Sequence, residues 1–200
     1  MHAYSTNDSR VRIYAYIATV SVLISILVTY ILGTTLDHNW LISSPALVGI
    51  YLVVYQLFDR WLWRWRLLSQ IGIVNERDIS GTYKGNLVTN YEQRKNPLLV
   101  KITIDQNWSK ILICFETGEK RTTSTSLIAH YEGVSKNLVR LTYTYRSKIN
   151  AGIADADMED NEGTAELRIK PDGSVEGNYF SSRPRKGTFT LKKTSDSSVK

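Results

Sequence analysis

The chain has a single cysteine, Cys114, among its 200 residues, so no intrachain disulfide can form. A fold without such a cross-link suits a reducing compartment. The three histidines are far apart in the sequence, and no spacing typical of a zinc site occurs. The sequence also lacks a Gly-x-Ser-x-Gly motif, a phosphate-binding loop and a His–Cys pairing. We therefore expect no metal, no other cofactor and no enzyme activity.

One acidic run, DADMEDNE, deserves comparison with a calcium-binding loop. Asp155, Asp157 and Glu159 stand at alternate positions, as calcium ligands do in such loops. Asp160 occupies the position at which the loop needs glycine. A solvated loop is therefore the expected structure of this segment.

Charged residues are scarce in the first 58 positions, and the excess of six positive charges lies in the remainder. Two uncharged segments occupy this part of the chain, Ile13–Leu32 and Trp40–Phe58. Twenty helical residues rise ~30 Å, the thickness of a bilayer core. The turn Gly33–Asn39 joins the segments, so we predict a transmembrane hairpin. A cleaved signal peptide is the alternative for the first segment, but its apolar run is too long and lacks a clear cleavage site.

Arginines flank the two spans on their outer sides: Arg10 and Arg12 before the first, and Arg60, Arg64 and Arg66 after the second. The connecting turn has no lysine or arginine, so the positive-inside rule places both termini and the body in the cytoplasm. Trp61, Trp63 and Trp65 lie among the last arginines, and steps of two residues distribute their rings around a helix axis. We predict a juxtamembrane Trp/Arg belt at the membrane interface, with a gating role as the alternative.

Small and weakly polar residues recur on single faces of the two spans: Ala18, Ser21, Ser25 and Thr29 in the first, and Pro45 and Gly49 in the second. Such residues permit close helix packing in lipid. The contact they serve is either between the two helices of one chain or between chains.

After Ile73 the apolar residues recur with period two, which indicates β-strands. Turns rich in Gly, Pro and Asn, and one longer break, Lys148–Gly163, separate eight predicted strands: Gly81–Thr89, Leu98–Asp105, Lys110–Glu116, Thr122–Tyr131, Leu138–Ser147, Thr164–Lys170, Ser174–Phe180 and Gly187–Lys193. Closure of such a sheet removes its exposed edges. We therefore predict a membrane-anchored all-β protein, in which an eight-stranded antiparallel up-and-down barrel of the lipocalin or avidin type follows the hairpin. A two-sheet sandwich is the alternative.

The expected domain boundaries follow from these assignments. Residues 1–75 form the hairpin with its belt, residues 76–194 form the cytoplasmic barrel, and residues 195–200 form a disordered tail.

The inner wall of this barrel would gather four tyrosines, Tyr83, Tyr143, Tyr145 and Tyr179. Beside them, the segment SSRPRKG places Arg183 and Arg185 in the turn between the last two strands. Aromatic rings stack on nucleobases and guanidinium groups bind phosphate, so these six residues together suit a small nucleotide. In the alternative interpretation the tyrosines only fill the core and the arginines are solvated. A register slip of one residue would exchange the tyrosines for their neighbours.

Two segments, ISGTYKGNL (Ile79–Leu87) and KGTFTLKK (Lys186–Lys193), begin and end the predicted barrel after the hairpin. In this arrangement the chain resembles the two-transmembrane, β-strand-rich effectors of bacterial cyclic-oligonucleotide (CBASS) anti-phage systems, the SMODS-associated family. The resemblance implies that the barrel binds a cyclic di- or trinucleotide made by a phage-triggered synthase. The effectors would then self-associate and disrupt the bacterial inner membrane, which arrests or kills the infected cell. The implied partners are the cyclic nucleotide, inner-membrane lipids and other copies of the chain, with no nucleic-acid polymer.

Two other functions fit the predicted fold. A membrane-tethered, lipocalin-like carrier or sensor would hold a small apolar ligand in a dry interior. A structural anchor for a protein partner would have a barrel filled by its own side chains.

Overall fold

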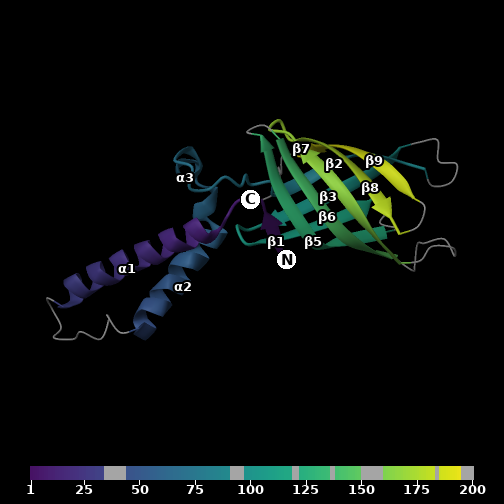
Figure 1. Ribbon diagram of the computed structural model, residues 1–200. Helices are drawn as coiled ribbons and strands as arrows, with labels where there is room; N and C mark the ends of the chain where they lie inside the picture. The colour runs from purple at the N-terminus through teal and green to yellow at the C-terminus, as the bar shows by residue number, and fades with distance from the viewer. Residues whose placement is uncertain are drawn as a thin grey trace. The chain divides into compact units, whose positions relative to one another are not determined.

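The computed structural model describes residues 1–33, 44–90, 97–118, 122–135, 138–149, 160–182 and 185–194 (Figure 1). The chain forms two compact units. One comprises Asp8–Glu76, and the other comprises Met1–Asn7 together with Arg77–Lys200. The first seven residues therefore belong with the strands, whereas the sequence placed them with the helices. The expected tail, residues 195–200, lies outside the described residues.

The helical unit contains α1 (Val11–Gly33), α2 (Ser44–Arg60), the short 3-10 helix η2 (Leu62–Arg64) and α3 (Arg66–Gln70). Within α1, the segment Val11–Ile31 is long and apolar enough to cross a membrane, and no other helix among the described residues meets this criterion. α2 has 17 residues. Residues 40–43, with which the second predicted span begins, lie outside the described ranges. The structure therefore supports one membrane-spanning helix, and the hairpin stays a prediction.

The predicted stripe of small residues on α1 is only partly covered. Ser21 and Ser25 are buried, whereas Ala18 is exposed. The Ser21 hydroxyl donates a hydrogen bond to the carbonyl oxygen of Ile17 at 2.7 Å, so helix backbone satisfies it. A Cβ atom added at Gly49 of α2 would meet no atom within 4 Å. Gly49 therefore makes no close helix contact with the described residues of this chain.

The predicted tryptophan belt takes a different form from the one expected. α2 ends at Arg60, and Trp65 has an extended backbone (φ −68°, ψ 128°) that separates η2 from α3. Trp61 and Trp65 are more than half exposed, whereas Trp63 is buried, with the Arg64 guanidinium carbon 5.3 Å from its ring centroid. Because the helix does not continue, the three rings do not surround one helix axis.

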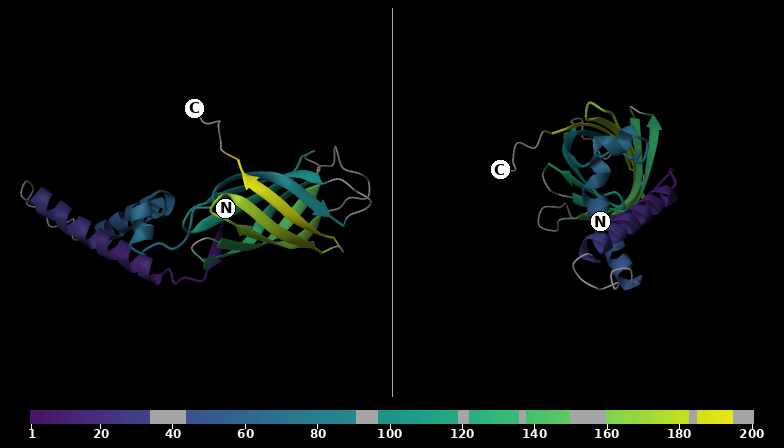
Figure 2. Two further views of the ribbon diagram at one scale, coloured as in Figure 1. Left: turned by 90° about the horizontal axis from the view of Figure 1, so that it is seen from above. Right: turned by 90° about the vertical axis from the view of Figure 1, so that its left-hand side faces the viewer.

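Nine strands form the second unit within the described residues: β1 (His2–Thr6), β2 (Gly81–Thr89), β3 (Leu98–Gln106), β4 (Lys110–Thr117), β5 (Thr122–Ser135), β6 (Leu138–Ile149), β7 (Asn161–Ile169), β8 (Ser174–Ser181) and β9 (Lys186–Lys193). From β2 to β9 each strand runs antiparallel to the next, and β9 pairs with β2. The sheet therefore closes on itself (Figure 2). The eight predicted strands are all present, in the expected neighbour order.

The ninth strand, β1, makes the sheet more complex than the expected eight-stranded barrel. β4 and β5 pair directly over only three residue pairs, from Cys114–Thr125 to Glu116–Thr123, and then diverge. β1 fills the gap, antiparallel to β4 and parallel to β5. Its Tyr4 is buried, and the phenol oxygen accepts a hydrogen bond from the Gln106 side-chain amide at 3.2 Å. β1 thus covers two strand edges that would otherwise be exposed.

One end of the barrel interior is solid. Aliphatic side chains from alternate positions fill it, among them Ile102, Ile104, Ile111, Ile113, Leu141 and Leu167. The backbone entering β2 is fixed at this end, because the Arg77 amide donates to the Tyr131 hydroxyl at 2.7 Å and the Ile79 amide donates to the Gln106 side-chain oxygen at 2.9 Å. We call this the closed end.

Candidate functional site: an aromatic cup at the open end of the barrel

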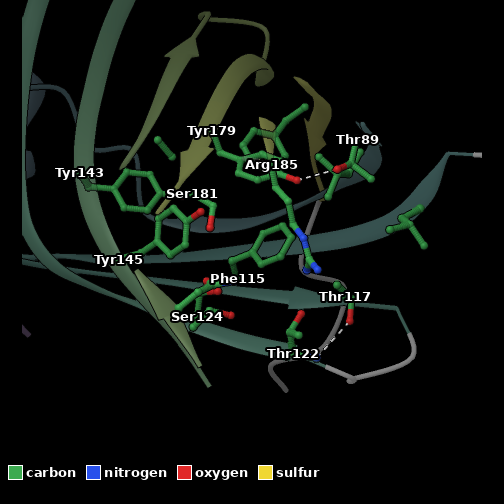
Figure 3. Close-up of a pocket in the computed structure, with 16 residues that line it drawn as sticks. Thr89, Phe115, Thr117, Thr122, Ser124, Tyr143, Tyr145, Tyr179, Ser181 and Arg185 are labelled. Atoms are coloured by element: carbon green, nitrogen blue, oxygen red, sulfur yellow. Dashed lines mark hydrogen bonds between the residues drawn. The ribbon is translucent and has the colours of Figure 1, made fainter. Parts of the chain in front are cut away.

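At the opposite end the barrel interior is hollow, with a cavity of about 140 Å³ that we call the cup (Figure 3). Two classes of side chain form most of its lining. The rings are Phe115, Tyr143, Tyr145, Tyr179 and Phe189, and the hydroxyls are Thr89, Thr117, Thr122, Ser124, Ser147 and Ser181. The remaining lining residues are Leu87, Leu98, Ala165, Asn161 and Arg185. This lining suits a ligand that has flat faces and many hydrogen-bonding groups.

Two of the rings come from one strand. Tyr143 and Tyr145 of β6 are two residues apart, so both point into the barrel, with ring centroids 6.3 Å apart. Burial raises the pKa of Tyr143, and burial with a smaller contribution from Tyr179 raises the pKa of Tyr145 to about 12. Both phenols are therefore neutral at physiological pH and can donate hydrogen bonds.

Glycines opposite two of the tyrosines leave the rings room beside the sheet. In the strand ladders Tyr145 pairs with Gly163, and Tyr179 pairs with Gly187. A Cβ atom at position 163 would lie 2.5 Å from the Tyr145 phenol oxygen, and one at position 187 would lie 2.5 Å from Cε1 of Tyr179. Because glycine has no side chain, each ring lies in space that the side chain of any other residue at that position would fill. The rings can therefore lie close to the wall of the cup.

A second group of rings lies on β4, β8 and β9. The Tyr179 ring centroid is 5.5 Å from that of Phe189, which is 5.7 Å from that of Phe115. The hydroxyl groups of Tyr179 and Thr89 are hydrogen-bonded at 2.7 Å (Figure 3). These contacts fix the orientation of the Tyr179 ring from both its edge and its hydroxyl end.

Arg185 brings positive charge into the cup. It precedes β9, and its carbonyl oxygen accepts a hydrogen bond from the Ser181 amide at 3.0 Å, which closes the β8–β9 connection. The half-buried side chain extends into the mouth of the cup (Figure 3). It is the one charged side chain among the described residues that line the cup. An anionic ligand would therefore meet a guanidinium group and no lining carboxylate in this part of the chain.

Four of the six residues predicted from the sequence lie together in the cup: Tyr143, Tyr145, Tyr179 and Arg185. Arg183 lies outside the described residues. Tyr83 was expected with them but lies elsewhere. It is buried at the closed end, where its hydroxyl donates a hydrogen bond to the Ile79 carbonyl oxygen at 2.8 Å. Thr89, on the same inner face of β2, does line the cup, but six residues of strand separate the two positions by ~20 Å.

Two further rings, Phe115 and Phe189, and all the hydroxyl groups of the cup were not predicted from the sequence. Phe189 shares the inner face of β9 with Gly187 and Leu191, and these residues alternate with outward-facing ones. Its inward direction was therefore readable from the sequence. Ser124 and Ser147 gave no such signal, because polar residues on inner faces do not produce an apolar alternation. No group of three or more His, Cys, Asp or Glu residues in the described ranges could hold a metal ion.

Comparison with known proteins agrees with this division of the chain. Residues 74–193 match the family profile described as Cap15, cyclic dinucleotide receptor domain, and residues 11–64 match the profile described as Cap15, TM helices. No curated protein matches the chain. The first profile falls on the strand-rich unit and the second falls on the helical unit. The first alone covers more than half of the sequence. The chain therefore belongs to the Cap15 family, which confirms its resemblance to the membrane effectors of CBASS anti-phage systems.

Proposed function

We propose that the cup binds a cyclic dinucleotide and that its occupancy makes membrane helices of several copies associate and disrupt the bacterial inner membrane. The observation that carries the proposal is the composition of the cup, in which five rings surround a cavity with one arginine at its mouth. Rings stack on nucleobases, at ~1–3 kcal/mol per base, and a guanidinium group binds phosphate oxygens in a planar fork. Both parts of a cyclic dinucleotide thus have a matching group.

The size of the cavity suggests how the ligand is divided. About 140 Å³ is less than the ~300–1,000 Å³ of pockets that enclose a drug-sized ligand. A base would therefore enter between the rings, and the phosphates would stay at the mouth beside Arg185. The neutral phenols of Tyr143 and Tyr145 would donate hydrogen bonds to acceptors on the base edge.

The position of β1 supports a two-span hairpin with both ends on the barrel side of the membrane. β1 precedes α1 and is a strand of the same closed sheet as β2–β9, which follow α3. The chain therefore leaves the barrel and returns to it between residues 7 and 77. If α1 crosses the bilayer, the chain must cross again before β2, and α2 is the one other helix of comparable length in the described residues. Cleavage of α1 as a signal peptide would also remove β1.

The same strands connect the cup to α1. Phe115 and Ser124, which line the cup, form one of the three direct β4–β5 pairs. Beyond these pairs the gap between β4 and β5 holds β1, which leads into α1 after four residues. A ligand that changes the spacing of β4 and β5 would therefore act on the strand attached to the first membrane helix. Association follows only if the ligand prefers that altered state.

The test measures binding and membrane damage on the full chain. Purified protein in detergent would be titrated with a panel of cyclic di- and trinucleotides, and protein in vesicles would be tested for dye release. We expect saturable binding of at least one cyclic dinucleotide, and dye release only in its presence. Arg185→Ala should weaken binding by roughly 10–100-fold, because hydrogen bonds to charged groups contribute ~1.5–3 kcal/mol.

The matched control is Arg168→Ala, which removes an exposed arginine from β7, outside the cup. It should leave binding unchanged. Equal binding by the two variants would show that Arg185 is not part of the binding site. Uptake of a fatty acid, unaffected by Arg185→Ala and without nucleotide binding, would instead support the carrier function.

A further inference from the structure

Three lysines form a row across the outer wall of the barrel. Lys84 of β2 is directly opposite Lys101 of β3 on one side and Lys192 of β9 on the other. We call these residues the lysine row. Side chains directly opposite in an antiparallel sheet have Cβ atoms ~4.5–5.5 Å apart, and like charges at that distance repel. The row therefore carries a cost in the isolated protein.

The other side of the barrel shows that this arrangement is not general. On the outer faces of β5–β8 cations stand beside carboxylates: Arg140 with Glu132 and Glu166, Arg146 with Glu162, Arg168 with Glu166, and Lys170 with Glu176. In the lysine row only Lys101 has an ion pair with a described residue, at 3.5 Å to Glu116. Positive charge is thus balanced on one wall of the barrel and concentrated on the other.

Two exposed apolar side chains adjoin the row. Leu99 is two residues before Lys101 on β3 and is 70% exposed, and Val88 is four residues after Lys84 on β2 and is 58% exposed. Leu99 pairs with Asn86, so Leu99 and Val88 are diagonal neighbours on the same outer face. A face with lysines beside a small apolar area has the composition of a surface that binds a lipid bilayer.

We propose that this wall, formed by β9, β2 and β3, docks on the anionic headgroups of the membrane that holds the helices. The charge of this wall and the tether of the chain to a membrane indicate that the partner is an anionic lipid surface. The three lysines need an anionic partner, the adjoining apolar side chains suit the headgroup region, and the chain is tethered to a bilayer through its membrane helix. Each lysine near an anionic surface strengthens attachment about fivefold. Lipid binding by this wall is separate from the cup, and it does not depend on the nucleotide.

The test is lysine footprinting of the full chain. Single copies would be placed in nanodiscs of phosphatidylcholine alone or with phosphatidylglycerol, and acetylated with an N-hydroxysuccinimide ester before mass spectrometry. We expect Lys84, Lys101 and Lys192 to react at least ~3-fold more slowly in the anionic discs, given the attraction of each lysine to anionic lipid. Protection should disappear at high salt, because ions screen the attraction. Lys148 and Lys170 should react equally in both discs and serve as references.

Two charge variants of a dye-labelled protein complete the test. The dye is attached to Asn86→Cys in a Cys114→Ser background, and headgroup-labelled anionic lipid should quench it. Lys84→Gln/Lys101→Gln/Lys192→Gln should abolish this quenching. Arg146→Gln/Lys148→Gln/Arg168→Gln should keep it, although it lowers the net charge equally. Equal reactivity of the row in both discs would overturn the proposal. Protection that is independent of lipid charge would overturn it too, because a protein surface would then cover the row.

Discussion

Replacement of Gly163 by alanine tests how the cup is kept open. The new Cβ atom would overlap the backbone carbonyl oxygen of Phe180, its nearest neighbour, and would lie 2.5 Å from the phenol oxygen and 2.6 Å from Cζ of Tyr145. Ordinary contacts begin at 3.4 Å, so the Phe180 carbonyl must shift and the Tyr145 ring must move by roughly 1 Å, and the space beside the ring is the cavity. Overpacking of this kind costs ~1–3 kcal/mol. We expect lower stability and, because the ring then fills part of the cup, about tenfold weaker nucleotide binding, which corresponds to ~1.4 kcal/mol.

The assay is thermal unfolding of the full chain in detergent, together with nucleotide titration. A loss of ~1–3 kcal/mol corresponds to a fall in Tm of roughly 4–12 °C for a barrel of this size. Gly133→Ala is the matched control, since a Cβ atom there would meet nothing within 4 Å, and it should leave both quantities nearly unchanged. In Gly163→Ala/Tyr145→Leu the shorter side chain should recover part of the lost stability. Strictly additive effects of the two changes would refute the proposed contact.

Two further predictions concern buried phenols. Folding raises the pKa of Tyr145 from about 10 to about 12, so its contribution to stability should be complete below pH 10 and lost as the pH rises toward 12. The Tm of Tyr145→Phe should therefore fall less steeply between pH 10 and pH 12 than the Tm of the unchanged protein. An identical fall would contradict the prediction. Tyr4→Ala should cost ~3–5 kcal/mol, as other truncations of buried aromatic residues do, because it empties the space that β1 fills between β4 and β5. Ser5→Ala, at an exposed position of the same strand, should have little effect on Tm, and equal losses in both variants would count against a specific role for Tyr4.

The strands of the barrel were predictable because each has one apolar face and ends at a turn. The alternation of Val100, Ile102 and Ile104 marks the inner face of β3, and all three residues are buried. β1 gave no such signal, because HAYST contains one buried residue and its place depends on a gap elsewhere. That gap begins where β4 and β5 diverge, near a register shift between Ser126 and Ile128. Divergence of two strands is a tertiary property that local sequence does not encode.

The direction of a side chain was readable from the sequence, but its depth along the barrel was not. Tyr83 pairs with Ile102, which pairs with Phe115, so the three residues form one row across the sheet. Phe115 lines the cup, whereas Tyr83 lies at the closed end. Strands in a barrel tilt against its axis by ~35–45°, so residues in one row reach different depths. Alternation alone therefore placed Tyr83 on the inner face and could not place it outside the cup.

Hydrogen exchange of the full chain, with and without a saturating cyclic dinucleotide, tests most directly whether the cup is the ligand site. Amides near the mouth, in residues 143–147 of β6 and 179–182 at the end of β8, should exchange more slowly when the nucleotide is bound. Amides at the closed end, such as Arg77 and Ile79, should show no direct protection, because their hydrogen bonds to Tyr131 and Gln106 are already made. Protection confined to the closed end, or none at the mouth under conditions where binding is saturated, would contradict the account.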